Sequence, residues 1–328
     1  MWKGVPVMCG PRGLESAPNI LYHNLGAGKF EDVSKPSGFE RTQGHYCFSV
    51  TTLDYNDDGW PDLYVACDST PAILYRNNHD GTFTDTAADA GVAFNEDGRE
   101  QAGMGSPSAD YDGDGDGELD LFKTNFSDDT STLYRNNGDG TYTDTTFAAG
   151  LGINTDALGW GAMFADVDND GWPDLLVVNG HVYPEVDSAK LGSFYREPRF
   201  LYNNLGNGKF RDISKTSGPG LAAPRSGRGL AIADLFNDGR LEAVISNLSD
   251  RPMLLVNLAK NQNHWLGLRL IGTSSNRDAI GARATLKSGS MRCGAALAIT
   301  RQTISASTSA SPLKLTLQAF RFAGQTAR

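Results

Sequence analysis

Short apolar segments alternate with turns rich in Gly, Asn and Asp along most of the chain, and no segment carries a sustained helical period. The clearest repeat reads Leu-Tyr-x-Asn, then a turn with glycine, then an aromatic residue, one spacer and aspartate. Two apolar stretches joined by such a turn predict a β-hairpin. Copies begin at Leu21, Leu74, Leu133 and Leu201, and a degraded copy begins at Leu254.

A second repeat alternates with the first and has the form Asp-x-Asp/Asn-x-Asp-Gly-x-x-Asp. Apolar residues flank each copy, so one strand is expected to enter it and another to leave it. The two repeats together predict four short strands per unit, which is typical of β-propeller blades, whereas a solenoid is the alternative. Clean copies cover residues 54–62 and 166–174, an expanded copy covers 110–120, and a degraded copy covers 234–242.

The aspartate-rich repeat also has the composition of a calcium loop. Side-chain oxygens at positions 1, 3, 5 and 9, with a carbonyl at position 7, give a hard cation the oxygen ligands that Ca²⁺ prefers, and Gly at position 6 permits a sharp turn. An EF-hand would need Glu at position 12, where this chain has Val65 and Val177. The predicted ligands are Asp54, Asn56, Asp58 and Asp62 in one loop, and Asp166, Asp168, Asp170 and Asp174 in another.

The two remaining copies predict their ligands less clearly. Counting from the preceding strand makes Asp110 position 1 of the expanded loop, whereas counting back from the following strand makes residues 116–120 its closing half. Both counts hold only if the loop contains two extra residues. In the degraded loop, Phe236 replaces a ligand and Glu242 replaces the last aspartate, so simple turn geometry is the competing interpretation. The candidate ligands there are Asp110, Asp112, Asp114, Asp116 and Asp120 in the first, and Asp234 and Asp238 in the second.

The net charge of −10 is unevenly distributed along the 328 residues. Residues 1–250 hold 18 Lys/Arg and 38 Asp/Glu, whereas residues 251–328 hold 11 Lys/Arg and one acid, Asp278. An acidic blade region attracts cations and repels nucleic acid, so we expect no nucleic-acid partner. No apolar run approaches the ~20 residues of a membrane helix, so no membrane span is expected.

The four cysteines show no metal-binding spacing. Four cysteines allow three pairings, and the sequence does not choose among them. Isolated thiols are the expected state, at Cys9, Cys47, Cys67 and Cys293.

These repeats resemble FG-GAP/VCBS repeats, the calcium-loop blades of integrin-α-like propellers. Residues 261–270 and 275–283 resemble the opening of the ASPIC/UnbV domain, which follows such blades in proteins similar to cartilage acidic protein and its bacterial relatives. The resemblance implies an all-β propeller that commonly closes with seven blades, bound Ca²⁺, no established catalytic residues, and an extracellular, cell-surface or periplasmic location. The implied division is blades over residues 14–258, the start of an ASPIC/UnbV domain over 259–290, and an atypical tail over 291–328.

Two expectations concern the ends of the chain. Residues 4–13 resemble a segment internal to longer relatives, so further blades and a signal peptide are expected upstream. The family pattern stops near Lys287, and residues 291–328 contain no acid, so this tail is expected to be frameshifted or disordered and sensitive to protease. An incomplete ring would expose strand edges and favour self-association.

The leading functional hypothesis is a non-enzymatic, calcium-stabilised module that binds an unidentified protein or carbohydrate. The alternative is a carbohydrate-active lyase or hydrolase built on the irregular insertion at residues 181–198, because long irregular loops on rigid scaffolds often carry function. Its candidate residues are His181, Tyr183, Glu185, Asp187 and Arg196.

Overall fold

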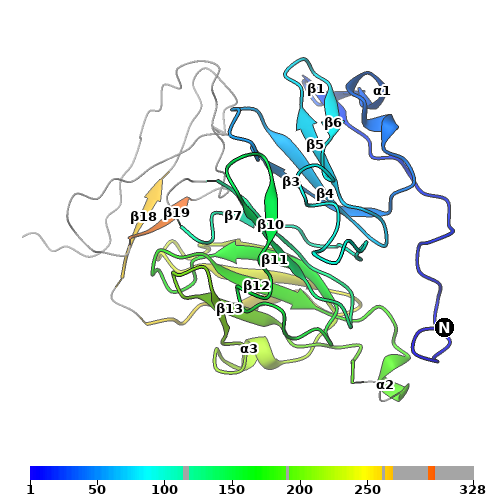
Figure 1. Cartoon of the computed structure of the whole chain (residues 1–328). Coiled ribbons are helices and arrows are strands. Elements are labelled where there is room, and N and C mark those ends of the chain that lie inside the picture. Colours follow the sequence, from blue (N-terminus) through cyan, green and yellow to red (C-terminus); the bar gives the residue numbers. More distant parts are fainter. Residues whose placement is uncertain (114–117, 190–191, 261–262, 269–294, 300–328) are drawn as a thin grey trace, which may run out of the picture.

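The computed structural model describes residues 1–113, 118–189, 192–260, 263–268 and 295–299. These residues form an all-β molecule whose small antiparallel sheets are arranged as propeller blades, as the two sequence repeats predict (Figure 1). The only helices in these ranges are single turns, namely α1 (Ser34–Ser37), η1 (Phe39–Arg41), α2 (Val186–Ala189) and α3 (Pro219–Ala222).

Three sheets have the predicted four strands, and we number the blades in chain order. Blade 1 contains β3 (Cys47–Leu53), β4 (Asp62–Cys67), β5 (Ile73–Asn77) and β6 (Phe83–Asp85). Blade 2 contains β7 (Ser108–Ala109), β8 (Asp120–Lys123), β9 (Thr132–Asn136) and β10 (Tyr142–Asp144). Blade 3 contains β11 (Gly159–Ala165), β12 (Asp174–Asn179), β13 (Phe200–Asn204) and β14 (Phe210–Asp212).

Fewer strands form at the two ends of this series. The first Leu-Tyr-x-Asn repeat gives a hairpin of β1 (Tyr22–Gly26) and β2 (Lys29–Asp32). Blade 4 has three strands, β15 (Gly227–Ala233), β16 (Glu242–Asn247) and β17 (Met253–Leu255). A separate parallel pair joins β18 (His264–Leu268) to β19 (Ala295–Ile299). The rest of the predicted ASPIC/UnbV segment and of the tail lies outside the described residues.

Neighbouring blades pack face to face through shared apolar clusters. Tyr64 of blade 1 lies in one cluster with Tyr134 of blade 2, and Phe122 of blade 2 lies in another with Phe210 of blade 3. A third cluster packs Leu201 against blade 4. The repeated aromatic residues therefore form the interfaces between blades, where burial of large apolar side chains stabilises the arrangement.

A glycine turn after the last strand of a blade reaches the next blade. The N–H of Tyr142 donates to the carbonyl of Ala90 (2.8 Å), and the adjacent Gly91 has φ +79°. A Cβ at Gly91 would lie 3.0 Å from the Tyr142 carbonyl oxygen, so both the conformation and the close approach favour glycine there. The same contact recurs at Gly150, opposite Phe210.

Two cysteines are paired, which corrects the expectation of isolated thiols. Cys47 and Cys67 stand opposite each other on β3 and β4 and form a disulfide. Their 20-residue separation carries no pairing signal, because only the strand register brings them together. Cys9 is a free, exposed thiol, and Cys293 lies outside the described residues.

The two ends of the blade series expose residues whose equivalents are buried inside it. Phe30 of the β1–β2 hairpin is 62% exposed, whereas its equivalent Phe210 is 6% exposed. Leu254 of blade 4 is 48% exposed, whereas its equivalent Leu201 is 8% exposed. These apolar surfaces have the chemistry of interfaces between blades.

We therefore expect the protein to self-associate as its concentration rises. The variant that combines Phe30→Lys with Leu254→Lys should associate less, because a charge at each end opposes burial of that surface. Light scattering coupled to size-exclusion chromatography measures the molar mass of the wild type and of the variant as concentration rises. A wild-type protein that stays monomeric at high concentration contradicts this expectation.

Candidate metal centres

Each aspartate-rich repeat forms the loop between the first two strands of a blade. We call these loops 1 (residues 54–62), 2 (110–120), 3 (166–174) and 4 (234–242). The side chain of the first aspartate accepts hydrogen bonds from main-chain N–H groups later in the loop and so stabilises the turn. In loop 3, Asp166 accepts hydrogen bonds from the N–H groups of Asp170 (3.0 Å) and Gly171 (2.9 Å), and Gly171 has φ +94°. In loop 1, Asp54 makes the same two contacts with Asp58 and Gly59.

Loop 3 gathers several carboxylates at one point. One oxygen each from Asp166, Asp168 and Asp174 lies within 4.8 Å of the others. Burial raises the pKa of Asp166 to about 6 and the pKa of Asp174 to about 7, and repulsion from the neighbouring carboxylates contributes to both shifts. Crowded, partly buried carboxylates are costly without a cation, and oxygen ligands in this number suit a hard divalent ion.

Loop 1 offers an amide oxygen at its third position. The Asn56 side-chain nitrogen donates to Asp58 Oδ2 (2.9 Å), which leaves Asn56 Oδ1 to act as an acceptor. That oxygen is buried, and no hydrogen-bond partner for it exists among the described residues. Burial raises the pKa of Asp62 in the same loop to about 7. A buried oxygen without a donor fits a cation ligand, because its desolvation is otherwise uncompensated.

Loop 2 resolves part of the ambiguity in its sequence. Asp110, Asp112 and Asp120 each place one oxygen within 4.8 Å of the others, which is consistent with Asp110 as the first position. Asp110 also accepts the N–H of Gly113 (2.8 Å). Asp114 and Asp116 lie outside the described residues and stay predictions.

Loop 4 keeps the turn but holds a basic side chain. Asp234 accepts the N–H groups of Asp238 (3.1 Å) and Gly239 (2.9 Å), as the first aspartate does in loops 1 and 3. The Arg240 guanidinium, however, forms an ion pair with Asp238, and hydrogen bonds from Arg240 lower the pKa of that carboxyl. Phe236, at the third position, is 54% exposed. Loop 4 is the least suited of the four to a metal ion, because the Arg240 side chain already supplies a positive charge and the third ligand is missing.

The last aspartate of loops 1 to 3 has a second role that the sequence analysis missed. Asp174 accepts the N–H groups of Asn204 (2.8 Å) and Val167 (3.2 Å) and the side-chain amide of Asn203 (3.0 Å). Asp120 and Asp62 make the equivalent main-chain contacts. This carboxylate therefore ties the loop to the third strand of its own blade, and the recurring pairing of the ninth aspartate with the Leu-Tyr-x-Asn motif is the signal that could have shown it.

The model of the FG-GAP-like repeat matches residues 13–65, 54–119 and 112–177, which together make up half of the chain and include loops 1 to 3. The chain belongs to the FG-GAP-like repeat family. It is also similar to cartilage acidic protein 1 of Mus musculus, at 28% identity over 211 residues, and of Homo sapiens, at 27% identity over 178 residues. The matches cover 63% and 51% of this chain, which spans about a quarter of the length of these relatives (28% and 25%).

A solved structure of an Agrocybe aegerita lectin, which recognises non-reducing terminal N-acetylglucosamine, shows a more remote likeness. The two are 17% identical, with a TM-score of 0.37 over 73% of this chain and 60% of that chain.

The insertion between β12 and β13 of this FG-GAP-like chain holds the residues of the enzymatic hypothesis. His181 is fully buried, its Nδ1 accepts the N–H of Tyr183 (3.0 Å), and its ring lies 4.8 Å from that of Trp2. Figure 1 shows the N-terminal segment running along the molecule to this region, near α2. Asp187 accepts the N–H of Tyr195 (2.8 Å). Glu185 and Arg196, in contrast, are exposed.

This environment favours a structural role for His181. Burial lowers its pKa to about 4, so the neutral ring is the stable form in the folded protein. Two buried charged residues at the end of the insertion also have structural contacts that the sequence analysis missed. Glu197 accepts the N–H of Leu158 (3.0 Å), and Arg199 donates to the carbonyl oxygens of Gly220 and Ala223.

We expect His181 to make the protein sensitive to acid. Its pKa in the unfolded chain is about 6.5, so the stability it contributes is present above that pH and is lost as the pH falls towards 4. His181→Phe should reduce the loss of unfolding free energy between pH 6.5 and 4 by up to about 3 kcal/mol. Urea unfolding across this pH range measures it, and identical pH profiles for the two proteins would refute the structural role.

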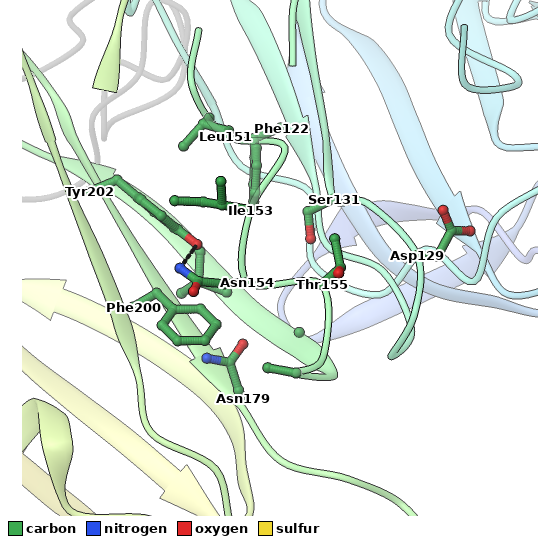
Figure 2. A pocket seen from close by; sticks show the side chains of 13 residues that line it. Phe122, Asp129, Ser131, Leu151, Ile153, Asn154, Thr155, Asn179, Phe200 and Tyr202 are labelled. Carbon is green, nitrogen blue, oxygen red and sulfur yellow. Dashed lines mark hydrogen bonds between the residues drawn. The ribbon is translucent and has the colours of Figure 1, made fainter. Parts of the chain in front are cut away.

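A small cavity lies between blades 2 and 3 (Figure 2). Phe122, Ile153, Phe200 and Tyr202 line it, and Asn154 donates to the Tyr202 hydroxyl (3.1 Å). Its volume of about 20 Å³ holds a single water molecule and is too small for a sugar ring. Separately, the described residues contain no helix with the length and apolar character needed to cross a bilayer.

Proposed function

We propose that this chain is a calcium-stabilised, non-enzymatic binding or adhesion module that acts outside the cytoplasm. The single observation that supports calcium most strongly is the group of carboxylates in loop 3, whose oxygens converge within 4.8 Å. Burial and mutual repulsion disfavour the ionised form of these carboxylates unless a cation is bound. Loop 2 repeats that arrangement with Asp110, Asp112 and Asp120, and loop 1 adds the buried amide oxygen of Asn56. Membership of the FG-GAP-like repeat family is consistent with a metal function.

The proposed ligand sets are those of the sequence repeat, and the converging oxygens of Asp110, Asp112 and Asp120 and of Asp166, Asp168 and Asp174 support part of them. Loop 3 would hold the cation through Asp166, Asp168, Asp170 and Asp174, and loop 1 through Asp54, Asn56, Asp58 and Asp62. Loop 2 would use Asp110, Asp112 and Asp120, together with Asp114 or Asp116. Asp234 and Asp238 of loop 4 belong to the original ligand prediction, but the ion pair with Arg240 argues against calcium there.

The proposed organisation keeps blades over residues 14–258, an ASPIC/UnbV segment over 259–290 and a tail over 291–328. Its partner would be an extracellular protein or carbohydrate. The similarity to cartilage acidic protein 1 supports the location, although the match spans only a quarter of those proteins. The burial of His181 beside exposed Glu185 and Arg196 does not favour the alternative of a lyase or hydrolase.

We expect calcium to bind most tightly at loop 3, because four carboxylates carry more charge than the three carboxylates and one amide of loop 1. Calorimetric titration of the wild type should show saturable binding at or below ~1 mM, the weak end for extracellular modules. Asp166→Ala with Asp170→Ala should remove the tightest binding event, whereas Asp234→Ala in loop 4 should leave the titration unchanged. Absence of binding at millimolar calcium would refute the proposal.

A further inference from the structure

In blades 2 to 4, the asparagine that ends the Leu-Tyr-x-Asn repeat bonds to the metal loop of the preceding blade. The side-chain nitrogen of Asn136 in blade 2 donates to the carbonyl oxygen of Tyr55 in loop 1 (2.9 Å). Asn204 in blade 3 donates in the same way to Tyr111 in loop 2 (2.7 Å). Asn257, after β17, donates to Val167 in loop 3 (2.7 Å). Each acceptor is the second residue of its loop, between the first two ligand positions.

Two of these asparagines, Asn136 and Asn204, also contact the metal loop of their own blade. The main-chain N–H of Asn204 donates to Asp174, the ninth residue of loop 3 (2.8 Å), and that of Asn136 donates to Asp120 in loop 2 (2.8 Å). One residue therefore holds a ligand carboxylate of its own loop and a backbone carbonyl of the loop before it. Asn136 and Asn204 are 6% and 1% exposed, so water competes little for these bonds.

The contacts join into one continuous series across three loops. The last aspartate of loops 2 and 3 also accepts the N–H of the second residue of its loop, and the carbonyl of that second residue accepts the next asparagine. The series therefore alternates between loops and asparagines without a break. In order, it passes through Tyr55, Asn136, Asp120, Tyr111, Asn204, Asp174, Val167 and Asn257.

A packing contact joins loops 2 and 3 independently of these hydrogen bonds. Gly113 of loop 2 lies against the indole of Trp172 in loop 3, where a Cβ would come within 2.2 Å of the ring. A shift of either loop would therefore displace the other, because closely packed groups have little free space.

We propose that these asparagines are positioning residues that couple neighbouring metal loops, so that an ion in one loop raises the affinity of the next. The proposal rests on the calcium function proposed above. An ion fixes the carboxylates of its loop, and the series of bonds extends that order to the adjacent loop, which then loses less conformational freedom on binding. Couplings of this kind typically change affinity by fivefold or more.

The test measures loop 3 with loop 2 intact or disabled. Terbium is the probe, and its luminescence is excited through Trp172 in a Trp60→Phe background. Because Trp172 also lies against Gly113 of loop 2, the part of this signal that Asp166→Ala with Asp170→Ala removes is taken to report on loop 3. Disabling loop 2 with Asp112→Ala should weaken terbium binding at loop 3 at least fivefold. In an Asn204→Ala background, the same loop 2 change should weaken it less than twofold.

Asn77→Ala is the matched control. Asn77 ends the repeat of blade 1, and its side-chain amide donates to Pro61 of its own loop, so the coupling between loops 2 and 3 should survive this change. If Asn204→Ala does not fold, Asn136→Ala carries the same test on loops 1 and 2, with terbium excited through Trp60.

The outcomes separate the two proposals. If disabling loop 2 does not change terbium binding at loop 3, the proposed coupling is wrong. If the coupling persists in the Asn204→Ala variant, the role of the asparagine is wrong. Neither outcome affects the proposed metal sites. Absence of terbium and calcium binding at every loop overturns the proposed function, and the coupling with it.

Discussion

Chelation of calcium should lower the thermal unfolding midpoint of this protein substantially. Each filled site at 100 times its dissociation constant contributes ~2.7 kcal/mol, so three sites give about 8 kcal/mol, comparable to the ~5–15 kcal/mol that holds a domain together. The physical reason lies in the loops, where burial and neighbouring carboxylates raise the pKa of Asp62, Asp120 and Asp174. A divalent ion removes the repulsion that these groups otherwise feel.

Scanning calorimetry with calcium and with excess chelator measures the effect. Asp166→Ala combined with Asp170→Ala should reproduce about a third of the loss, because it empties one of three loops. Asp234→Ala is the matched control, because it changes the same position of loop 4, where Arg240 supplies the positive charge. If chelator leaves the wild-type midpoint unchanged, the aspartate-rich loops are turns without a metal function.

Asp174→Ala should destabilise the protein even in chelator. This carboxylate accepts the N–H groups of Asn204 and Val167 and the amide of Asn203, and its loss leaves two buried donors and one partly buried donor unsatisfied. Each such donor costs about 1–3 kcal/mol, so we expect a loss of about 3 kcal/mol or more without any metal. Calcium should not restore the midpoint, because a ligand is missing as well.

Asp168→Ala separates the metal role from the structural role in the same loop. Asp168 lies with Asp166 and Asp174 in the carboxylate cluster but is not the residue that ties the loop to β13. Its substitution should cost stability in calcium and little in chelator, as measured by urea unfolding in both conditions. Equal losses for Asp168→Ala and Asp174→Ala in chelator would contradict the assignment of two roles to the ninth position.

Local sequence pattern was sufficient to predict the blades. The strands are short and antiparallel, and a turn with glycine joins the last two strands of blades 1 to 3, so these hairpins are specified locally, within residues 73–85, 132–144 and 200–212. The strands around loop 3, residues 159–165 and 174–179, follow the predicted apolar segments closely. The turn geometry of the loops was equally local, since one aspartate and one glycine six positions into the repeat determine it.

Contacts that depend on register between distant strands could not be predicted in this way. The pairing of Cys47 with Cys67 follows from the alignment of β3 with β4. The bond from Asn204 to Tyr111 spans 93 positions and exists only because blade 3 packs on blade 2. In loop 4, the sequence signalled a lost ligand at Phe236, but the ion pair between Arg240 and Asp238 depends on the side-chain conformation of the folded loop.

The number of calcium ions bound per chain tests the central claim most directly. Native mass spectrometry of the protein equilibrated in millimolar calcium should show three ions on the wild-type chain, one in each of loops 1 to 3. The Asp166→Ala, Asp170→Ala variant should show two at most, and Asp234→Ala should still show three. A wild-type chain that carries no calcium under these conditions would contradict the account.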